Sequence, residues 1–205
     1  MIRHTLLLLL LSALTATGAD LIELGKLSAA SATAESSKDY PTAIRHIETY
    51  AKSGGEPFYA ALRLGWLHYL NGSYADAQRH YSKAASLQPT SINAKLGVLN
   101  TAVANKNARL THVAATALLK LDPINYQALS ALAGLSFARR DYREADTGYA
   151  RILNYYPDDP DALSGAAWSA LRNGDKTTAH ERFQLLLGRN PAYPDAQNGF
   201  QQSSQ

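Results

Sequence analysis

The sequence predicts an all-α protein in which about five helix hairpins stack into an α-solenoid after an N-terminal signal peptide. The first observation behind this fold class is a set of four prolines, Pro89, Pro123, Pro157 and Pro191, that lie 34 residues apart. A period in the range of roughly 20–50 residues indicates a repeat array. The second observation is that the segments ending at these prolines carry similar residue types at the same offsets. The third is that their apolar residues recur at steps of three and four, as amphipathic helices require.

Composition narrows the class of protein. Hydrophobic residues make up 46% of the 205 residues, which supports a packed core and excludes wholesale disorder. The formal net charge of +3 is too small to steer the protein onto nucleic acid. The chain has no cysteine, so disulfides, thiol catalysis and thiolate metal sites are excluded.

Residues 1–19 have the order of a secretory signal peptide. Arg3 and His4 give a short basic start, an apolar run follows over residues 6–14, and small residues lead to Ala19. We expect cleavage after Ala19, with Gly18 as the alternative site. The apolar run is shorter than the ~20 residues of a membrane-spanning helix, and an uncleaved anchor is the alternative. The sequence thus predicts a periplasmic or secreted protein with no transmembrane segment after signal removal.

The shared offsets predict hairpins over residues 58–91, 92–125, 126–159 and 160–193. Two columns of small residues and one of aromatic residues recur in three of these units: Gly65, Ala133 and Ala167; Ala77, Ala145 and Ala179; Tyr81, Tyr149 and Phe183. A polar turn lies between the two apolar stretches of each unit. The hairpin over 92–125 keeps the length but places Leu99, Thr111 and Ala115 in these three columns. We still interpret it as a divergent repeat, because the period runs through it.

Weaker patterns extend the array at both ends. Residues 20–57 are expected to form a degenerate first hairpin, with a first helix from about Leu21 to Ser36. Residues 194–205 are expected to form a short capping helix and a frayed tail beginning at Gln201. Pro123 and Pro160 each follow an acidic residue, so we expect both to start helices.

The quoted columns resemble the tetratricopeptide repeat (TPR) family, at its Leu-Gly, Ala, Tyr/Phe and Pro positions, over about 150 residues of this chain. The resemblance implies a right-handed α-solenoid whose concave groove is lined by the first helix of every hairpin. Together with the signal-like residues 1–19, it suggests a member of exported type. Exported members commonly serve the assembly of outer-membrane, secretion or polysaccharide-export machines. Some TPR proteins grip a terminal carboxylate, but this chain has only Asn100 at a clamp position and lacks the lysines around it.

The resemblance also indicates which side chains face the groove and form a candidate partner-binding site. The principal candidates are Tyr59, Leu62, Trp66, Tyr69, Asn93, Asn100, Gln127, Phe137, Trp168 and Arg172; Leu96, Val103, Ser130, Asp161 and Ser164 share these columns. Trp and Tyr are frequent anchors of binding sites, and amide side chains pair with an extended backbone. In the alternative interpretation, Trp66 and Tyr69 pack against the preceding hairpin. Trp168 is expected to be the more exposed of the two tryptophans.

No catalytic constellation is found. Five histidines follow the signal segment (His46, His68, His80, His112 and His180), and none is paired with an acid at metal-ligand spacing. Asp158, Asp159 and Asp161 are interpreted as a helix N-terminal cap rather than a calcium site. Arg139, Arg140 and Arg143 are expected to be neutralised by Asp141, Glu144 and Asp146. Nucleophile-elbow and phosphate-loop motifs are absent from the sequence.

These observations predict a non-enzymatic scaffold without cofactor or metal, which binds a peptide or helix of a protein partner in the cell envelope. Nucleic acid is not an expected partner. The first alternative is self-assembly into a dimer or lattice, through the degenerate first hairpin and the tail near Tyr193 and Phe200. The second is carbohydrate binding as an accessory to polysaccharide export, because aromatic and amide side chains also suit sugar rings.

Overall fold

The computed structural model describes residues 18–204, and within this range the chain is built of helices joined by short turns. The predicted signal peptide, residues 1–19, lies outside the described residues except for Gly18 and Ala19, which begin the first helix. The helices are α1 (Gly18–Ser36), α2 (Tyr40–Lys52), α3 (Pro57–Leu70), α4 (Tyr74–Leu87), α5 (Ile92–Ala104), α6 (Ala108–Leu119), α7 (Tyr126–Ala138), α8 (Tyr142–Tyr155), α9 (Pro160–Arg172), α10 (Lys176–Arg189) and α11 (Ala196–Ser203).

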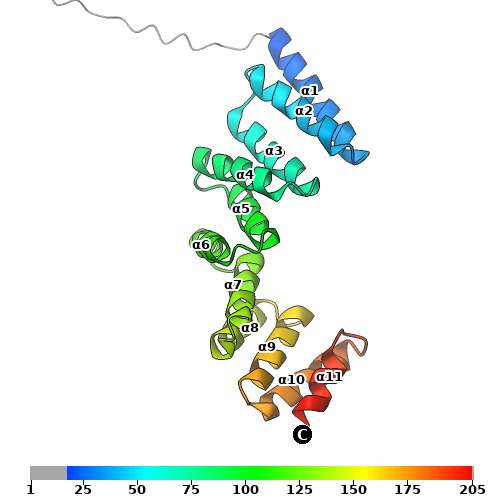
Figure 1. Cartoon of the computed structure of the whole chain (residues 1–205), viewed down its shortest axis with the longest axis vertical. Coiled ribbons are helices and arrows are strands. Elements are labelled where there is room, and N and C mark those ends of the chain that lie inside the picture. Colours follow the sequence, from blue (N-terminus) through cyan, green and yellow to red (C-terminus); the bar gives the residue numbers. More distant parts are fainter. Residues whose placement is uncertain (1–17, 205) are drawn as a thin grey trace, which may run out of the picture.

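The helices form an elongated array that runs from α1 at one end to α11 at the other (Figure 1). Each helix packs on the helix before it and the helix after it in the chain. Alternate helices also meet, because α3 contacts α5, α5 contacts α7, and α7 contacts α9. Hairpins that contact only their neighbours are the definition of a solenoid, so the predicted fold class is confirmed. No helix among residues 18–204 is both long and apolar enough to cross a bilayer.

The turn inside each hairpin repeats the same backbone geometry. One residue per turn has a positive φ, and these residues lie 34 positions apart: Lys38, Gly72, Lys106, Arg140 and Gly174. The next helix begins shortly after, and in four of the five hairpins a side chain such as Asp141 or Asp175 caps its first turn, while Ser73 at the start of α4 makes no capping hydrogen bond. A residue in the left-handed region followed by a capped helix reverses the chain within a few residues.

Aromatic rings join consecutive hairpins by entering the space that glycines leave open. The ring of Tyr81 lies against Gly97 of the next hairpin, where an added Cβ would come within 2.2 Å of it. The ring of Tyr149 lies against Gly165 in the same way, and the ring of Phe183 against Gly199. A Cβ so close to a ring is sterically forbidden, so these glycines are needed for the close approach of neighbouring hairpins.

The divergent hairpin, α5 and α6, solves the same packing problem differently. It has Ala115 where the hairpins over 58–91, 126–159 and 160–193 have a ring, and Leu99 where they have Gly65, Ala133 and Ala167. Leu99 and Ala115 are both buried in one cluster, so the leucine supplies apolar volume that the missing ring would have supplied. The facing position in the next hairpin is Ala131 rather than glycine, because no ring needs the space.

Two expectations about helix ends are wrong. Pro123 does not start a helix: α7 begins at Tyr126, because the Asn125 side chain accepts from the amide of Ala128 and fixes the first turn there. The tail does not fray at Gln201, since α11 continues to Ser203. By contrast Pro160 does begin α9, with Asp159 as its cap.

Candidate functional site

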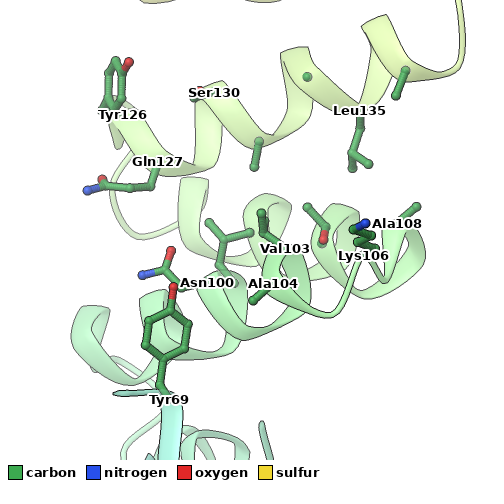
Figure 2. A pocket seen from close by; sticks show the side chains of 15 residues that line it. Tyr69, Asn100, Val103, Ala104, Lys106, Ala108, Tyr126, Gln127, Ser130 and Leu135 are labelled. Atoms are coloured by element: carbon green, nitrogen blue, oxygen red, sulfur yellow. The ribbon is translucent and has the colours of Figure 1, made fainter. Parts of the chain in front are cut away.

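A pocket of about 660 Å³ lies where α7 faces α5, and we call it the α5–α7 pocket (Figure 2). The first helices of three consecutive hairpins supply most of its lining, and the turn and start of α6 supply the rest. The lining residues are Tyr69, Leu99, Asn100, Val103, Ala104, Lys106, Ala108, Thr111, Tyr126, Gln127, Ser130, Ala131, Gly134, Leu135 and Ala138.

The two ends of the pocket differ in chemistry. Figure 2 shows Asn100 and Gln127 at the same end as Tyr69 and Tyr126, and both amide side chains are exposed. The middle is lined by small or aliphatic residues, and Lys106 lies at the opposite end. Amides from two neighbouring helices above an apolar floor can hydrogen-bond a ligand's backbone while the floor takes its side chains.

The pocket coincides with the divergent hairpin. The residue equivalent to Ala131 is Gly97 in α5, Gly165 in α9 and Gly199 in α11. Each of these glycines lies against a ring of the hairpin before it: Tyr81, Tyr149 and Phe183, respectively. No ring from the preceding hairpin occupies the Ala131 column, since Ala115 stands there, and Ala131 lines the pocket instead. The open space thus lies at the junction where the ring–glycine pair is replaced by Ala115 and Ala131.

Tyr126 is held in place at the amide end. Its ring packs edge-on against Tyr156 with ring centres 5.4 Å apart. Burial, together with the negative charge of Asp159 and a hydrogen bond to it, raises the pKa of the Tyr126 phenol to about 12. The phenol therefore stays protonated at neutral pH and is a fixed part of the pocket wall.

Among the predicted groove residues, the structure brings Tyr69, Asn100 and Gln127 together in this pocket, with Val103 and Ser130. The pocket also contains Tyr126, Lys106 and Leu135, which the sequence analysis did not single out. Lys106 belongs to a helix-to-helix turn and Tyr126 to a helix start. The 34-residue period identified both places, but not that they border an opening.

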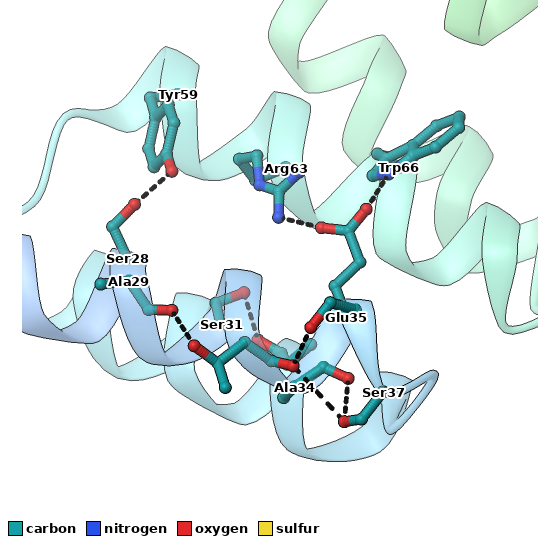
Figure 3. Close-up of polar contacts among 12 residues, drawn as sticks. Ser28, Ala29, Ser31, Ala34, Glu35, Ser37, Tyr59, Arg63 and Trp66 are labelled. Carbon is teal, nitrogen blue, oxygen red and sulfur yellow. Dashed lines mark hydrogen bonds and ion pairs between the residues drawn. The ribbon is translucent and has the colours of Figure 1, made fainter.

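Two predicted groove residues nearer the N-terminus, Tyr59 and Trp66, contact α1 instead (Figure 3). The hydroxyls of Tyr59 and Ser28 share a hydrogen bond of 2.5 Å, and the Tyr59 ring packs edge-on against Tyr50. Leu62 packs on the cluster around Ala61 and Ala84. Tyr59 thus joins the first two hairpins, whereas Leu62 packs within the second hairpin and toward α5; both are only partly exposed.

Trp66 is tied to α1 through Glu35. Its indole N–H donates to one carboxylate oxygen of Glu35 at 2.6 Å, and the Arg63 guanidinium donates to the other at 2.5 Å (Figure 3). Partial burial alone would raise the pKa of the Glu35 carboxyl, but these two hydrogen bonds and the Arg63 charge bring its pKa below the ordinary value. One face of Trp66 stacks on Tyr69, with ring centres 6.3 Å apart. Because Tyr69 lines the α5–α7 pocket, Trp66 lies between the first hairpin and this pocket.

The remaining predicted groove residues lie apart from the pocket. Asn93 is exposed near the start of α5, and Phe137 packs against Tyr142. Trp168 packs edge-on against Phe183, and Arg172 lies over its ring, with 5.4 Å between the guanidinium carbon and the ring centre. The expectation that Trp168 is the more exposed tryptophan is wrong, because the C-terminal cluster under α11 partly covers it while Trp66 is 39% exposed.

The polar clusters of the sequence have structural roles. Asp159 accepts from the amide of Ala162, Asp158 pairs with Arg189, and Asp161 accepts from the Tyr193 hydroxyl. His68 and His80 stack on each other with ring centres 5.2 Å apart. Within the described part of the chain, no group of three or more His, Asp or Glu side chains is placed to hold a metal ion.

The stacked helix hairpins define a helical-repeat protein, and its pocket lies among the first helices of these hairpins. The family model described as tetratricopeptide repeat matches residues 33–92 and 137–196, which is more than half of the chain. The protein belongs to this family. Tetratricopeptide repeats typically form a non-enzymatic fold for protein interaction.

Solved structures share the fold at low sequence identity. A crystal structure of MamA protein has a TM-score of 0.75 at 16% identity, over 82% of this chain and 92% of that chain. A tetratricopeptide repeat protein from Parabacteroides merdae has a TM-score of 0.79 at 17% identity, over 89% of this chain and 72% of that one. YrrB, described as a TPR protein with an unusual peptide-binding site, has a TM-score of 0.74 at 13% identity, over 91% of this chain and 100% of that one. No curated protein matches the sequence.

Proposed function

We propose that the protein is a non-catalytic scaffold of the cell envelope that holds an extended peptide or a helix of a partner protein in the α5–α7 pocket. One observation carries the proposal: exposed amides on two neighbouring inner helices, Asn100 and Gln127, border an apolar floor in a pocket of about 660 Å³. This volume falls within the usual range of ligand pockets. Amides with both donor and acceptor groups are suited to a peptide backbone.

Two further observations support the proposal. YrrB, which shares the fold, is described as having a peptide-binding site, so an array of this shape is compatible with peptide binding. The order of residue types over 1–19 supports export, and with it a partner in the envelope. The roles common among exported members of the family favour a place in the assembly of an outer-membrane, secretion or polysaccharide-export machine.

The test places a photo-reactive amino acid at Gln127 and compares it with one at Gln184, an exposed glutamine on α10 outside the pocket. We expect one dominant envelope protein to cross-link from Gln127 and not from Gln184. Gln127→Arg combined with Asn100→Arg should weaken binding of that partner by about tenfold or more, while Gln184→Arg should leave it unchanged. Equal cross-linking from both glutamines, or full binding by the double variant, would contradict the proposal.

Self-assembly is the second candidate, and one observation favours it. Leu21 and Ile22 on α1 are 60% and 64% exposed at one end of the array. Exposed neighbouring apolar side chains are a feature of association surfaces. Sedimentation across a concentration series should then show oligomers that Leu21→Glu with Ile22→Glu abolishes. A monomer at every concentration removes this candidate.

A further inference from the structure

We propose that the partner segment carries an apolar side chain next to carboxylate side chains, and that these carboxylates lie over a basic edge formed by Lys106, Arg109, Arg139 and Arg140. This inference rests on the proposed function, because it specifies the chemistry of the segment that occupies the α5–α7 pocket. It adds the recognised charge, the direction of the segment and the residues that read it.

A second, smaller pocket extends the first one toward the basic edge. It encloses about 300 Å³ and is lined by Ala108, Arg109, His112, Val113, Leu135 and Arg139. Ala108 and Leu135 line both pockets, so the two openings adjoin there. Figure 2 shows Lys106, Ala108 and Leu135 together at the end of the first pocket that lies away from Tyr126 and Gln127. A segment leaving the apolar floor in this direction meets the basic edge.

The charge around the two pockets is one-sided. Their lining includes Lys106, Arg109 and Arg139 and contains neither Asp nor Glu. Glu144 is the one acid paired with this edge, since it binds Arg139 at 3.1 Å. Among the ion pairs of residues 18–204, none engages Lys106, Arg109 or Arg140.

Of the acids that the sequence analysis assigned to these arginines, Glu144 pairs with Arg139 as expected, whereas the expectation is wrong for Asp146. Asp146 pairs with Arg182 of α10. Asp141 accepts from the amide of Glu144 as the cap of α8. Asp141 and Glu144 offset only part of the charge of the four basic residues, so the basic edge keeps a surplus of positive charge and a carboxylate-bearing segment is complementary to it.

Backbone conformation marks the same edge. Lys106 and Arg140 have φ of 52° and 64°, in the left-handed region that favours glycine. The equivalent residues of the other three hairpins are Gly72, Gly174 and Lys38, so a side chain is retained at three of the five turns. Side chains retained in a disfavoured conformation are found at functional sites more than elsewhere. At this edge the retained side chains are cations: Lys106 lines the first pocket, and Arg140 directly follows Arg139, which lines the second.

The opposite end of the pocket sets the direction of the segment. Tyr126 is close enough to Asp159 and Asp161 for their charges to raise its pKa. That end thus repels carboxylates, whereas the Lys106 end attracts them. The bound segment places its apolar side chain on the floor between Val103 and Leu135 and its carboxylates beyond, toward Arg109.

A protein segment fits these features better than a polyanion without side chains. The floor of small and aliphatic residues offers nothing to a sugar or a phosphate chain. Val103 and Val113, which are 49% and 57% exposed, add apolar contacts beside the two pockets. Asn100 and Gln127 complete the match, since they pair with backbone groups.

The test selects short random peptides displayed on phage against the purified protein and reads their sequences. We expect the selected peptides to be enriched in Asp and Glu close to an apolar residue. The dominant peptide, labelled with fluorescein, is then compared by fluorescence polarisation with its amidated form, in which Asp and Glu become Asn and Gln. The amidated form should bind about tenfold more weakly, and raising the salt concentration should weaken only the acidic form.

Charge reversal at the edge assigns the effect to named residues. Lys106→Glu with Arg109→Glu should weaken the acidic peptide by about tenfold or more and change the amidated peptide little. Arg45→Glu with Lys52→Glu on α2, which reverses the same two residue types far from both pockets, should have no effect. Lys106→Gly should weaken binding while raising thermal stability, because it removes the cation and relieves the left-handed backbone. A purely structural role for Lys106 would not move these two readouts in opposite directions.

The outcomes separate this inference from the proposed function. Peptides that lose binding in Asn100→Arg/Gln127→Arg but show no acid enrichment, or bind unchanged after charge reversal, overturn the inference and leave the proposed function standing. Selected peptides that still bind the Asn100→Arg/Gln127→Arg variant would instead overturn the proposed function. A sulfated oligosaccharide that displaces the acidic peptide from the edge at equal concentration would show that the edge recognises anions in general, and would overturn the assignment to a protein segment.

Discussion

At the scale of single residues, the stacked pair of His68 and His80 makes the stability depend on pH. The Nδ1 atom of His68 is buried without a hydrogen-bond partner, and its ring stacks on that of His80. Burial lowers the pKa of both imidazoles; the charges of Asp76 and Glu48 act in the opposite direction at His68. Each ring is therefore kept neutral in the folded protein.

The lowered pKa values predict a loss of stability on acidification. Below the unfolded-state pKa of about 6.5, the unfolded chain binds protons that the folded chain does not. The free energy of unfolding therefore decreases as the pH is lowered, until the pH is below the folded-state pKa values. His68→Phe removes one of these groups and the unpartnered nitrogen. We expect it to raise the stability by about 1 kcal/mol at neutral pH and to flatten the loss between about pH 7 and pH 5.

Urea unfolding followed by circular dichroism across that pH range provides the measurement. The His68→Phe/His80→Phe double variant should flatten the profile further, because the charges of His68 and His80 also oppose each other. An unchanged pH dependence in both variants would show that the stacked pair does not control the acid response. Carboxylates add little in this window, since their ordinary pKa values lie lower.

At the scale of elements, the contact between a ring of one hairpin and a glycine of the next sets the helix spacing. Gly97→Ala would place a Cβ within 2.2 Å of the Tyr81 ring, which is enclosed on its other side by Gly65. We expect a destabilisation of roughly 1–3 kcal/mol, as is usual for overpacking a core. Gly188→Ala on α10 is the matched control, because a Cβ there meets nothing within 4 Å. It should stabilise the helix by roughly 0.5–1 kcal/mol.

Thermal and urea unfolding of the two alanine variants test this contrast. Equal stability of Gly97→Ala and the parent would mean that α4 and α5 can separate without cost, and that the ring does not fix their spacing. The additional replacement of Tyr81 by Leu in the Gly97→Ala background should recover part of the loss. Leu99 with Ala115 already shows an aliphatic residue in the place of a ring.

The elements themselves were largely predictable, whereas the pocket was not. The 34-residue period and the small, Ala and aromatic columns placed the hairpins, because each column reports a contact that recurs at several junctions. The pocket depends on one junction where Ala115 and Ala131 replace a ring and a glycine. The sequence showed Ala115 as a departure from the pattern, but only the packing shows that Leu99 fills the core while the Ala131 column stays open.

The two tryptophans show the same limit at the ends of the array. Both occupy equivalent places in the repeat, yet Glu35 of α1 binds Trp66 and the cluster under α11 partly covers Trp168. Which side chain is covered depends on how the terminal helices fold back. That arrangement arises from tertiary contacts that the repeat pattern does not encode.

At the scale of the whole molecule, the terminal helix completes the core. Phe183 is fully buried, and α11 covers it with Gly199 and Phe200. Ending the chain after Pro194 would expose Phe183 and its neighbours, and we expect a loss of roughly 2–4 kcal/mol. Ending it after Ser203 removes only the last two residues and should cost far less.

Hydrogen exchange should show the effect in α9 and α10 and little change in α3. Each hairpin is stabilised by contacts with its neighbours only, so a loss at one end should stay near that end. Equal loss of protection along the whole chain would contradict this local view.

The ring–glycine contacts also determine where the gene of this protein can tolerate duplication. The unit over residues 160–193 contains both Gly165 and Phe183. If this unit were duplicated in tandem, Tyr149 would lie against Gly165 of the first copy, Phe183 of the first copy against Gly165 of the second, and Phe183 of the second against Gly199 of α11. The unit over 58–91 would set Tyr81 against Arg63, and the unit over 126–159 would set Tyr149 against Ala131. Only the last complete hairpin among these three is compatible with itself. The array is therefore able to lengthen at its C-terminal end, one 34-residue unit at a time, without altering the pocket near its middle.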